Sequence, residues 1–129
     1  VKDQPFSIRY PKASSVEFQE PDQIELLPIG SWDVEQKGED ALVLAVGPMT
    51  YTSLEATKKA ILKNYNIEVV NCRFIKPMDI SYLSSAVSKF SNLITIEESN
   101  VSGGFGDGVS SWLLENNFKG KLKRYGKTT

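Results

Sequence analysis

The chain has 129 residues, of which 40% are hydrophobic and 24% are charged, the composition of one ordinary globular domain. Its formal net charge of −1 argues against a protein that binds nucleic acids, because such proteins carry a strong basic excess. One cysteine and no histidine exclude an internal disulfide and a structural zinc site. No apolar run approaches the roughly 20 residues that span a bilayer. We therefore expect a cytoplasmic protein without membrane contacts.

The amino-terminal part of the chain is polar and interrupted by prolines. Residues 5–10 predict a short strand that ends at a proline, which has no N–H group to donate to a strand ladder. Residues 13–30 contain two prolines and show no hydrophobic periodicity, which indicates a linker. Residues 31–36 predict an edge strand, and we expect the main domain to comprise residues 31–129.

A buried strand and a helix come next. Residues 41–46 are apolar throughout, as expected of a strand that is buried on both faces. The following helix has a capping-box pattern formed by Thr52 and Glu55, three residues apart. One face of this helix carries apolar residues at helical spacing, namely Leu54, Ile61 and Tyr65.

The second half of the chain repeats this order of elements. Residues 67–74 predict a strand in which Cys72 is an inert buried thiol, and Asp79 predicts the N-cap of a helix. Residues 93–96 predict a third core strand, and residues 121–125 predict a final strand. The two helices between these strands bear apolar stripes at Ile80, Leu83, Val87 and Phe90, and at Val109, Trp112 and Leu113. Strands that alternate with amphipathic helices predict a three-layer α/β/α domain, whose strand order the pattern leaves open.

A glycine-rich segment at residues 103–108 stands between a strand and a helix, where a nucleotide phosphate could bind. The register does not fit a dinucleotide fingerprint, which would need glycine or alanine at Val109 or Ser111, and no Gly-Lys-Ser/Thr follows. We therefore interpret the glycines as sites of tight turns and close helix–strand approach. Glu97 and Glu98 precede the segment but point to opposite faces of their strand, so we favour a structural role, with hydrogen bonds accepted from the amides of the glycine loop, over catalysis.

The remaining polar residues suggest few reactive groups. We expect Arg73 to be an interface or ion-pair residue. A serine-rich helix at residues 84–88 has no histidine base, so nothing supports a nucleophilic triad. The basic residues near the carboxyl terminus are interpreted as protection of an edge strand rather than as a site for an anionic partner; these are Lys119, Lys121, Lys123, Arg124 and Lys127.

Three phrases occur in order along the chain: Ile8-Arg9-Tyr10-Pro11-Lys12, Arg73-Phe74-Ile75-Lys76-Pro77-Met78-Asp79, and Ile96-Glu97-Glu98 followed by Gly103-Gly104-Phe105-Gly106. Together they resemble the carboxyl-terminal end of the 1-deoxy-D-xylulose-5-phosphate synthase family, thiamine-diphosphate enzymes of the transketolase superfamily. The phrase that starts at Arg73 is the most specific of the three. The resemblance implies a five-stranded, mostly parallel sheet with one antiparallel edge strand, and it makes residues 1–12 the tail of a preceding pyrimidine-binding domain.

The resemblance also implies a reaction for a longer parent enzyme, which would condense pyruvate with glyceraldehyde 3-phosphate and release carbon dioxide. The product, 1-deoxyxylulose 5-phosphate, would serve isoprenoid and thiamine biosynthesis. The implied cofactors are thiamine diphosphate and magnesium, and the implied assembly is a homodimer in the cytoplasm, or in a plastid in a plant or alga. The family's catalytic residues and metal ligands lie upstream, so we expect this chain, which begins at Val1, to be a catalytically silent fragment that binds no cofactor or metal.

One functional position is implied within the chain. The basic residue after Tyr-Pro in this family resembles a ligand of the acceptor phosphate, and its counterpart here is Lys12, where the family usually has arginine. Lysine offers a point charge instead of a planar two-pronged donor, and a solvated linker lysine is the alternative. A second hypothesis for the whole chain is a domain for subunit assembly or docking, as in the β subunit of a 2-oxoacid dehydrogenase.

Overall fold

The structure is a computed structural model that describes Pro5 and residues 25–128. A single five-stranded sheet with the strand order β1-β3-β2-β4-β5 forms its centre, and only β1 runs antiparallel to its neighbour. This arrangement confirms the predicted α/β fold with one antiparallel edge strand. The predicted strand at residues 5–10 and most of the linker at residues 13–30 lie outside the described residues. In chain order the elements are β1 (Asp33–Gln36), β2 (Ala41–Ala45), α1 (Met49–Ile61), β3 (Ile67–Asn71), α2 (Ile80–Lys89), β4 (Asn92–Asn100), α3 (Phe105–Glu115) and β5 (Lys121–Lys127).

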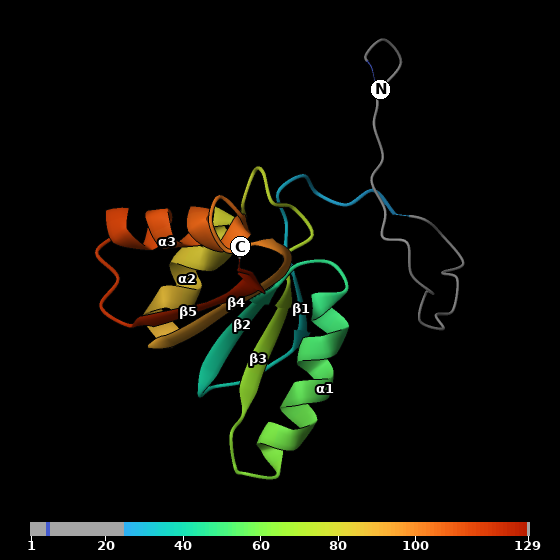
Figure 1. Cartoon of the computed structure of the whole chain (residues 1–129), viewed down its shortest axis with the longest axis vertical. Coiled ribbons are helices and arrows are strands. Elements are labelled where there is room, and N and C mark those ends of the chain that lie inside the picture. Colours follow the sequence, from blue (N-terminus) through green and yellow to red (C-terminus); the bar gives the residue numbers. More distant parts are fainter. Residues whose placement is uncertain (1–4, 6–24, 129) are drawn as a thin grey trace.

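The helices divide unequally between the two faces of the sheet (Figure 1). Helices α2 and α3 cover one face, and α1 alone packs on the other, where the buried core is limited to Val43, Ala45 and Val69. Alternate residues of β2 serve the two faces, because successive strand residues point in opposite directions. The larger core, on the face of α2 and α3, is built from Trp32, Leu42, Leu44, Val70, Cys72, Leu83, Ala86, Phe90, Leu93, Phe105, Val109 and Leu113.

The buried face of α1 differs from the one predicted. The helix begins at Met49 after Pro48, without a side-chain cap, so the capping box expected at Thr52 is wrong. Ile61 and Tyr65, which were expected on the buried stripe, are exposed. The buried residues are small and polar (Thr50, Ser53 and Thr57), and the hydroxyls of Ser53 and Thr57 donate to carbonyls of their own helix at 2.7 Å. A hydroxyl that is satisfied within its helix can be buried at little cost.

The turn between β3 and α2 ties distant parts of the chain together. Asp79 caps α2 as predicted: its Oδ1 accepts a hydrogen bond from the amide of Tyr82 at 2.8 Å. Its Oδ2 also accepts from the amide of Trp32 at 3.0 Å. The indole of Trp32 donates to the carbonyl of Phe74 at 2.8 Å and packs on the rings of Tyr82 and Phe105. Residues 73–79 therefore position the segment that leads into β1.

Some boundaries of the elements differ from the prediction. Strand β3 ends at Asn71, so Phe74 is outside it, and β1 starts at Asp33 because the two preceding residues pack against the turn. Ile80, predicted on the buried stripe of α2, is exposed at its first turn, whereas Leu83 and Phe90 are buried as expected. Strand β5 lies at the edge of the sheet and alternates exposed and half-buried residues, as expected of an edge strand.

We predict that Asp79→Ala lowers the free energy of unfolding by about 2–3 kcal/mol. The substitution removes a helix cap and also leaves the Trp32 amide without its acceptor. Urea denaturation followed by tryptophan fluorescence measures the effect. The control is Ser84→Ala on the exposed side of α2, which should change stability by no more than about 0.5 kcal/mol. Equal losses in both variants would contradict the dual role of Asp79.

Candidate functional site

A hollow of about 700 Å³ opens at the carboxyl ends of β2 and β4. Open α/β sheets bind their ligands at such ends, where loops from neighbouring strands diverge. The hollow is lined by Val46, Gly47, Pro48, Ile75, Glu97, Glu98, Ser99, Asn100, Gly103, Gly104, Phe105 and Lys127. Its geometry is therefore set by the β2–α1 turn, by the end of β4 and by the glycine loop.

Glu97 is the central charged residue of this hollow, yet it is directed into the protein. Its side chain is 5% exposed. Oε2 accepts from the amide of Phe105 and Oε1 accepts from the amide of Gly106, both at 2.8 Å. These are the first two residues of α3, so the carboxylate satisfies unpaired amides at the positive end of the helix dipole. The predicted hydrogen bonds from the glycine loop to a structural glutamate are confirmed.

Glu98 has the opposite environment, because it is exposed to solvent. The two carboxylates are thus separated by the strand, as predicted, and do not form an acid–base pair. The amides that could hold a phosphate at the start of α3 are already occupied by Glu97. This favours the structural interpretation of the glycine loop over a nucleotide site.

The glycines permit the close approach that these hydrogen bonds require. Gly103 has a φ of +74°, a left-handed conformation that residues with a side chain rarely adopt. A Cβ atom at Gly104 would lie 2.3 Å from the carbonyl oxygen of Asn100 and 2.4 Å from Oε2 of Glu97. A side chain at this position would therefore displace the buried carboxylate.

A second carboxylate, Asp107, closes the other side of the glycine loop. Its Oδ2 accepts from the amide of Gly103 at 2.6 Å, and its Oδ1 pairs with the guanidinium of Arg124 from β5. The hydrogen bond from Gly103, followed by the contact with Arg124, lowers the pKa of Asp107. Arg124 is accordingly an internal partner of α3 and not, as predicted, an edge-protecting residue. No local sequence pattern marks this role of Asp107, because its partner is 17 residues away.

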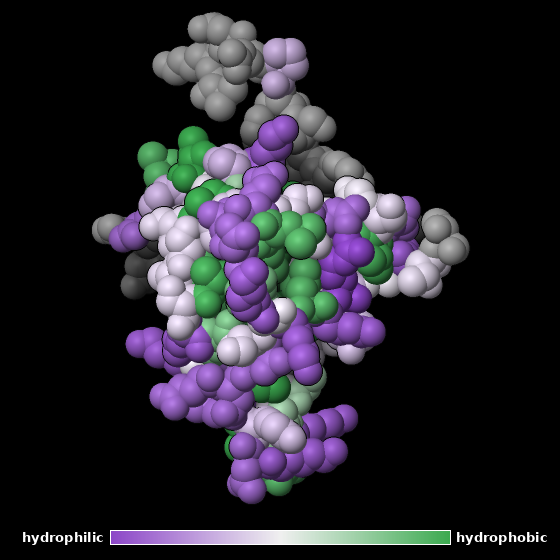
Figure 2. Space-filling model, turned by 90° about the vertical axis from the view of Figure 1, so that its left-hand side faces the viewer, coloured by the Kyte–Doolittle hydropathy of each residue, from purple (hydrophilic) through white to green (hydrophobic). Residues whose placement is uncertain are grey.

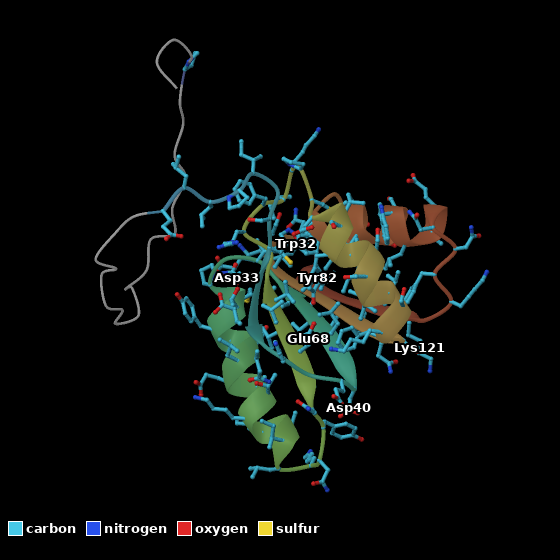
Figure 3. The ribbon with its side chains drawn as sticks, turned by 180° about the vertical axis from the view of Figure 1, so that it is seen from behind. Trp32, Asp33, Asp40, Glu68, Tyr82 and Lys121 are labelled. Atoms are coloured by element: carbon cyan, nitrogen blue, oxygen red, sulfur yellow. The ribbon has the colours of Figure 1, made fainter. Side chains whose placement is uncertain are left out.

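A buried polar cluster lies near the opposite, amino-terminal end of the parallel strands. Glu68 of β3 is 6% exposed, and its Oε1 accepts from the hydroxyl of Tyr82 at 2.6 Å (Figure 3). Its Oε2 accepts from Lys89 of α2 at 3.1 Å and from the amide of Gly38 at 3.2 Å, while Lys89 also donates to the carbonyl of Gly38 at 2.8 Å. The cluster joins the β1–β2 connection, β3 and α2, and no local sequence pattern marks its four residues.

The hydrogen bonds of this cluster decide its ionisation. Burial of Glu68 opposes the charged form, but the donors Tyr82, Lys89 and Gly38 outweigh burial, so the pKa of Glu68 is lowered from its ordinary value of 4.5. Burial and the neighbouring Glu68 carboxylate raise the pKa of Tyr82. The cluster is therefore an ion pair with a neutral phenol, held for structural reasons.

Two other predicted positions are structural as well. Arg73 makes the predicted ion pair, with Nη1 at 3.3 Å from Oδ2 of Asp33, and its Nη2 donates to Ser31 at 3.2 Å. Cys72 is 1% exposed, directly after β3, and burial raises the pKa of its thiol. A protonated, buried thiol packs as a small apolar side chain.

The hollow does not fit a magnesium diphosphate. Magnesium in such sites needs oxygen ligands from carboxylates, and Glu97 is already engaged by α3. Within residues 25–128, no group of three His, Cys, Asp or Glu residues is placed to hold a metal ion. Nor does that part of the chain contain a helix long and apolar enough to cross a membrane. Lys12, the implied phosphate ligand, lies outside the described residues.

Comparison with known proteins identifies a matching family. The model of the transketolase C-terminal domain matches residues 30–128. The 1-deoxy-D-xylulose-5-phosphate synthase of Lysinibacillus sphaericus is 40% identical over 105 residues, which cover 81% of this chain and 17% of that enzyme. The synthase of Halothermothrix orenii is 34% identical over 125 residues, which cover 96% of this chain and 20% of that enzyme. The chain thus spans about a fifth of the length of these relatives.

Solved structures agree with this fold. A split-gene transketolase, whose structure is that of an inactive tetramer (beta4), superposes on this chain with a TM-score of 0.75 at 28% identity. The match covers 80% of this chain and 34% of that one. A 2-oxoglutarate:ferredoxin oxidoreductase from Magnetococcus marinus superposes with a TM-score of 0.57 at 17% identity, covering 77% of this chain and 17% of that one. The second likeness concerns the fold alone.

We predict that Glu97→Gln lowers the free energy of unfolding by about 2–3 kcal/mol, because the amide NH₂ group would face one of the two α3 amides and leave it unpaired. The adjacent Glu98→Gln is the matched control and should change stability by no more than about 0.5 kcal/mol. Chemical denaturation of both variants at neutral pH gives the comparison. A Glu97→Gln variant as stable as Glu98→Gln would show that the carboxylate does not hold α3.

We predict that the Glu68 cluster makes the free energy of unfolding fall at acidic pH. Because the pKa of Glu68 is lower in the folded chain than its ordinary value of 4.5, its contribution is complete above that value and is lost as the pH falls below it. In Glu68→Gln, the free energy of unfolding should decrease less steeply on acidification, measured between about pH 3 and pH 7. The slope should be reduced and not abolished, since Asp107 also has a lowered pKa. An unchanged slope would refute the role of Glu68.

Proposed function

This chain belongs to the transketolase C-terminal domain family, and from this membership we propose that it is the C-terminal domain of a 1-deoxy-D-xylulose-5-phosphate synthase. The observation that carries the proposal is the identity of 33–40% with synthases of this name over 81–96% of the chain. The phrase from Arg73 to Asp79, the most specific of the three that resemble this family, also supports it. The domain boundaries that we propose are residues 1–12, 13–30 and 31–129.

The longer protein that contains this domain would condense pyruvate with glyceraldehyde 3-phosphate and release carbon dioxide, for isoprenoid and thiamine biosynthesis. Thiamine diphosphate, held with magnesium in other domains, would supply the carbanion chemistry of this reaction. We further propose that the full-length enzyme is a cytoplasmic homodimer. The substrates would bind mainly to those other domains, with Lys12 as the contribution of this chain to the acceptor phosphate.

The proposed role of the domain itself is structural, without a catalytic group. Four acidic side chains support this role, because each accepts hydrogen bonds from donors within the domain: Glu68, Asp79, Glu97 and Asp107. A general acid or base needs a carboxyl group that can reach a substrate, whereas Glu68 and Glu97 are buried and Asp79 and Asp107 are held by internal hydrogen bonds. The domain would therefore stabilise the arrangement of the parent enzyme and its dimer.

The alternative, a domain of a 2-oxoacid dehydrogenase β subunit, has less support. The relatives reported above are synthases, and the specific phrase at residues 73–79 favours them. Retention of an acyltransferase core by the longer protein, without synthase activity, would favour the dehydrogenase.

The decisive experiment uses the longer protein encoded by the parent reading frame. We expect it to form 1-deoxyxylulose 5-phosphate from pyruvate and glyceraldehyde 3-phosphate in the presence of thiamine diphosphate and magnesium. Isothermal calorimetry of the 129-residue chain alone should detect no binding of thiamine diphosphate. Absence of synthase activity in the longer protein, or micromolar cofactor binding by the short chain, would overturn the proposal.

For Lys12 we predict a substrate-selective effect in that longer enzyme. Lys12→Gln should raise the KM for glyceraldehyde 3-phosphate about tenfold, the loss expected for one charge-assisted hydrogen bond, and leave the KM for pyruvate unchanged. Lys12→Arg is the control that retains the charge and should keep the KM near that of the parent. Unchanged KM values for both substrates would contradict the prediction and indicate a solvated linker lysine.

A further inference from the structure

A small apolar pocket lies where the turn between β3 and α2 meets the start of α3. Its volume is about 310 Å³, and it is lined by Ile75, Lys76, Met78, Gly104, Phe105 and Gly108. Three of these residues, Ile75, Gly104 and Phe105, also line the hollow at the carboxyl ends of β2 and β4, so the pocket adjoins that hollow. Sites for small molecules are mostly apolar clefts of about 300–1,000 Å³, so this pocket suits a compact ligand.

Gly108 is the feature of the pocket that packing within the described domain does not explain. A Cβ atom would lie 2.3 Å from another atom at Gly104 and 2.6 Å from one at Gly106, so both positions require glycine. At Gly108 the nearest atom of the described residues outside the helix backbone is Sδ of Met78, at an ordinary distance of 3.7 Å, and the φ angle is not positive. Glycine inside a helix is less stable than alanine, and it is typical of places where a ligand approaches the backbone closely.

Lys76 supplies the charge of this pocket. It is the one charged residue of the lining, it is exposed, and it makes no ion pair within residues 25–128. Asp79 and Asp107, the acidic residues of the same turn and the same helix start, are held by hydrogen bonds within the domain. The ammonium group of Lys76 can therefore pair with an anionic group of a ligand whose hydrocarbon part lies in the pocket.

Two observations restrict the kind of ligand. The amides of Phe105 and Gly106, the first two of α3, already donate to Glu97 and are not available to a phosphate. Figure 2, which looks onto the side of the molecule that carries α3 and β5, shows hydrophobic surface divided by bands of hydrophilic side chains. Apolar areas divided in this way favour contacts of the size of a small molecule over a broad protein interface.

We propose that this pocket, which we call the Met78–Gly108 pocket, binds a small aryl carboxylate. The ring would lie against Met78 and Phe105 in the space that Gly108 leaves open, and the carboxylate would pair with Lys76. A thioether sulfur makes favourable contacts with aromatic rings, and a lysine beside an apolar pocket selects anionic over cationic ligands. Such binding is independent of the proposed synthase activity.

The test uses the two methionines of the chain, which give two resonances after isotope labelling of their methyl groups. Met78 lines the pocket, whereas Met49, at the start of α1, does not and serves as the internal reference. Titration of the chain with phenylpropionate should shift the Met78 resonance and not the Met49 resonance, with a Kd of about 1 mM, as expected for a ligand of this size. Phenylpropylamine, the matched cationic probe, should bind at least about fivefold more weakly.

Two pairs of variants make the test specific. Lys76→Gln should weaken binding of phenylpropionate by about two- to fivefold, whereas Lys119→Gln, beyond the opposite end of the sheet, should leave it unchanged. Gly108→Ala should weaken binding by about fivefold, because the methyl group occupies part of the pocket, and it should raise the urea midpoint of unfolding. Ser111→Ala, at an exposed position of the same helix, should not change binding.

Several results would overturn the proposal. These are no shift of the Met78 resonance, equal affinity for the two probes, or unchanged binding in Gly108→Ala. A lower midpoint of unfolding in Gly108→Ala would show that packing within the domain requires the glycine. A shift of Met78 with inorganic phosphate at the same ionic strength would show a general anion site, and a shift with the concentration of the chain alone would show that a second copy occupies the pocket.

Discussion

The hydrogen bonds between the Glu97 carboxylate and the first two amides of α3 are the interaction on which the carboxyl-terminal half of the domain depends. A buried carboxylate is destabilising unless donors surround it, and the unpaired amides of a helix start supply those donors. The same bonds require the chain to pass close to β4, which explains the glycine at position 104. These bonds fix the start of α3, which contributes Phe105, Val109 and Leu113 to the large core.

A similar arrangement at the other end of the sheet also joins separate elements through a buried carboxylate. Glu68 joins the β1–β2 connection to α2 as Glu97 joins β4 to α3, and Asp107 joins α3 to β5. In each case an acidic group accepts hydrogen bonds from donors that another element supplies, and these bonds fix how the elements pack. The hollow at the carboxyl ends of the strands lies where open α/β sheets bind ligands, and its buried carboxylate, Glu97, holds the start of α3.

The two faces of the sheet have different roles. On the face of α2 and α3, large apolar residues and Trp32 form a closed core. On the face of α1, the buried helix residues are small and polar, and apolar surface remains on β4 and β5. Burial of apolar surface is the main driving force for folding, so the face of α2 and α3 contributes more of the stability of the described domain.

The sequence by itself determined the order of elements, the class of fold, the Asp79 cap and the structural role of Glu97, because these follow from periodicity and from neighbours a few residues apart. It did not determine the packing of α1, the Glu68 cluster, the Arg124–Asp107 pair or the place of Trp32. Those features join residues that are 14 to 51 positions apart, as in the contacts of Tyr82 with Glu68 and of Lys89 with Gly38. Only the tertiary structure brings such partners together, since whether a polar side chain can be buried depends on a donor or acceptor supplied by another element.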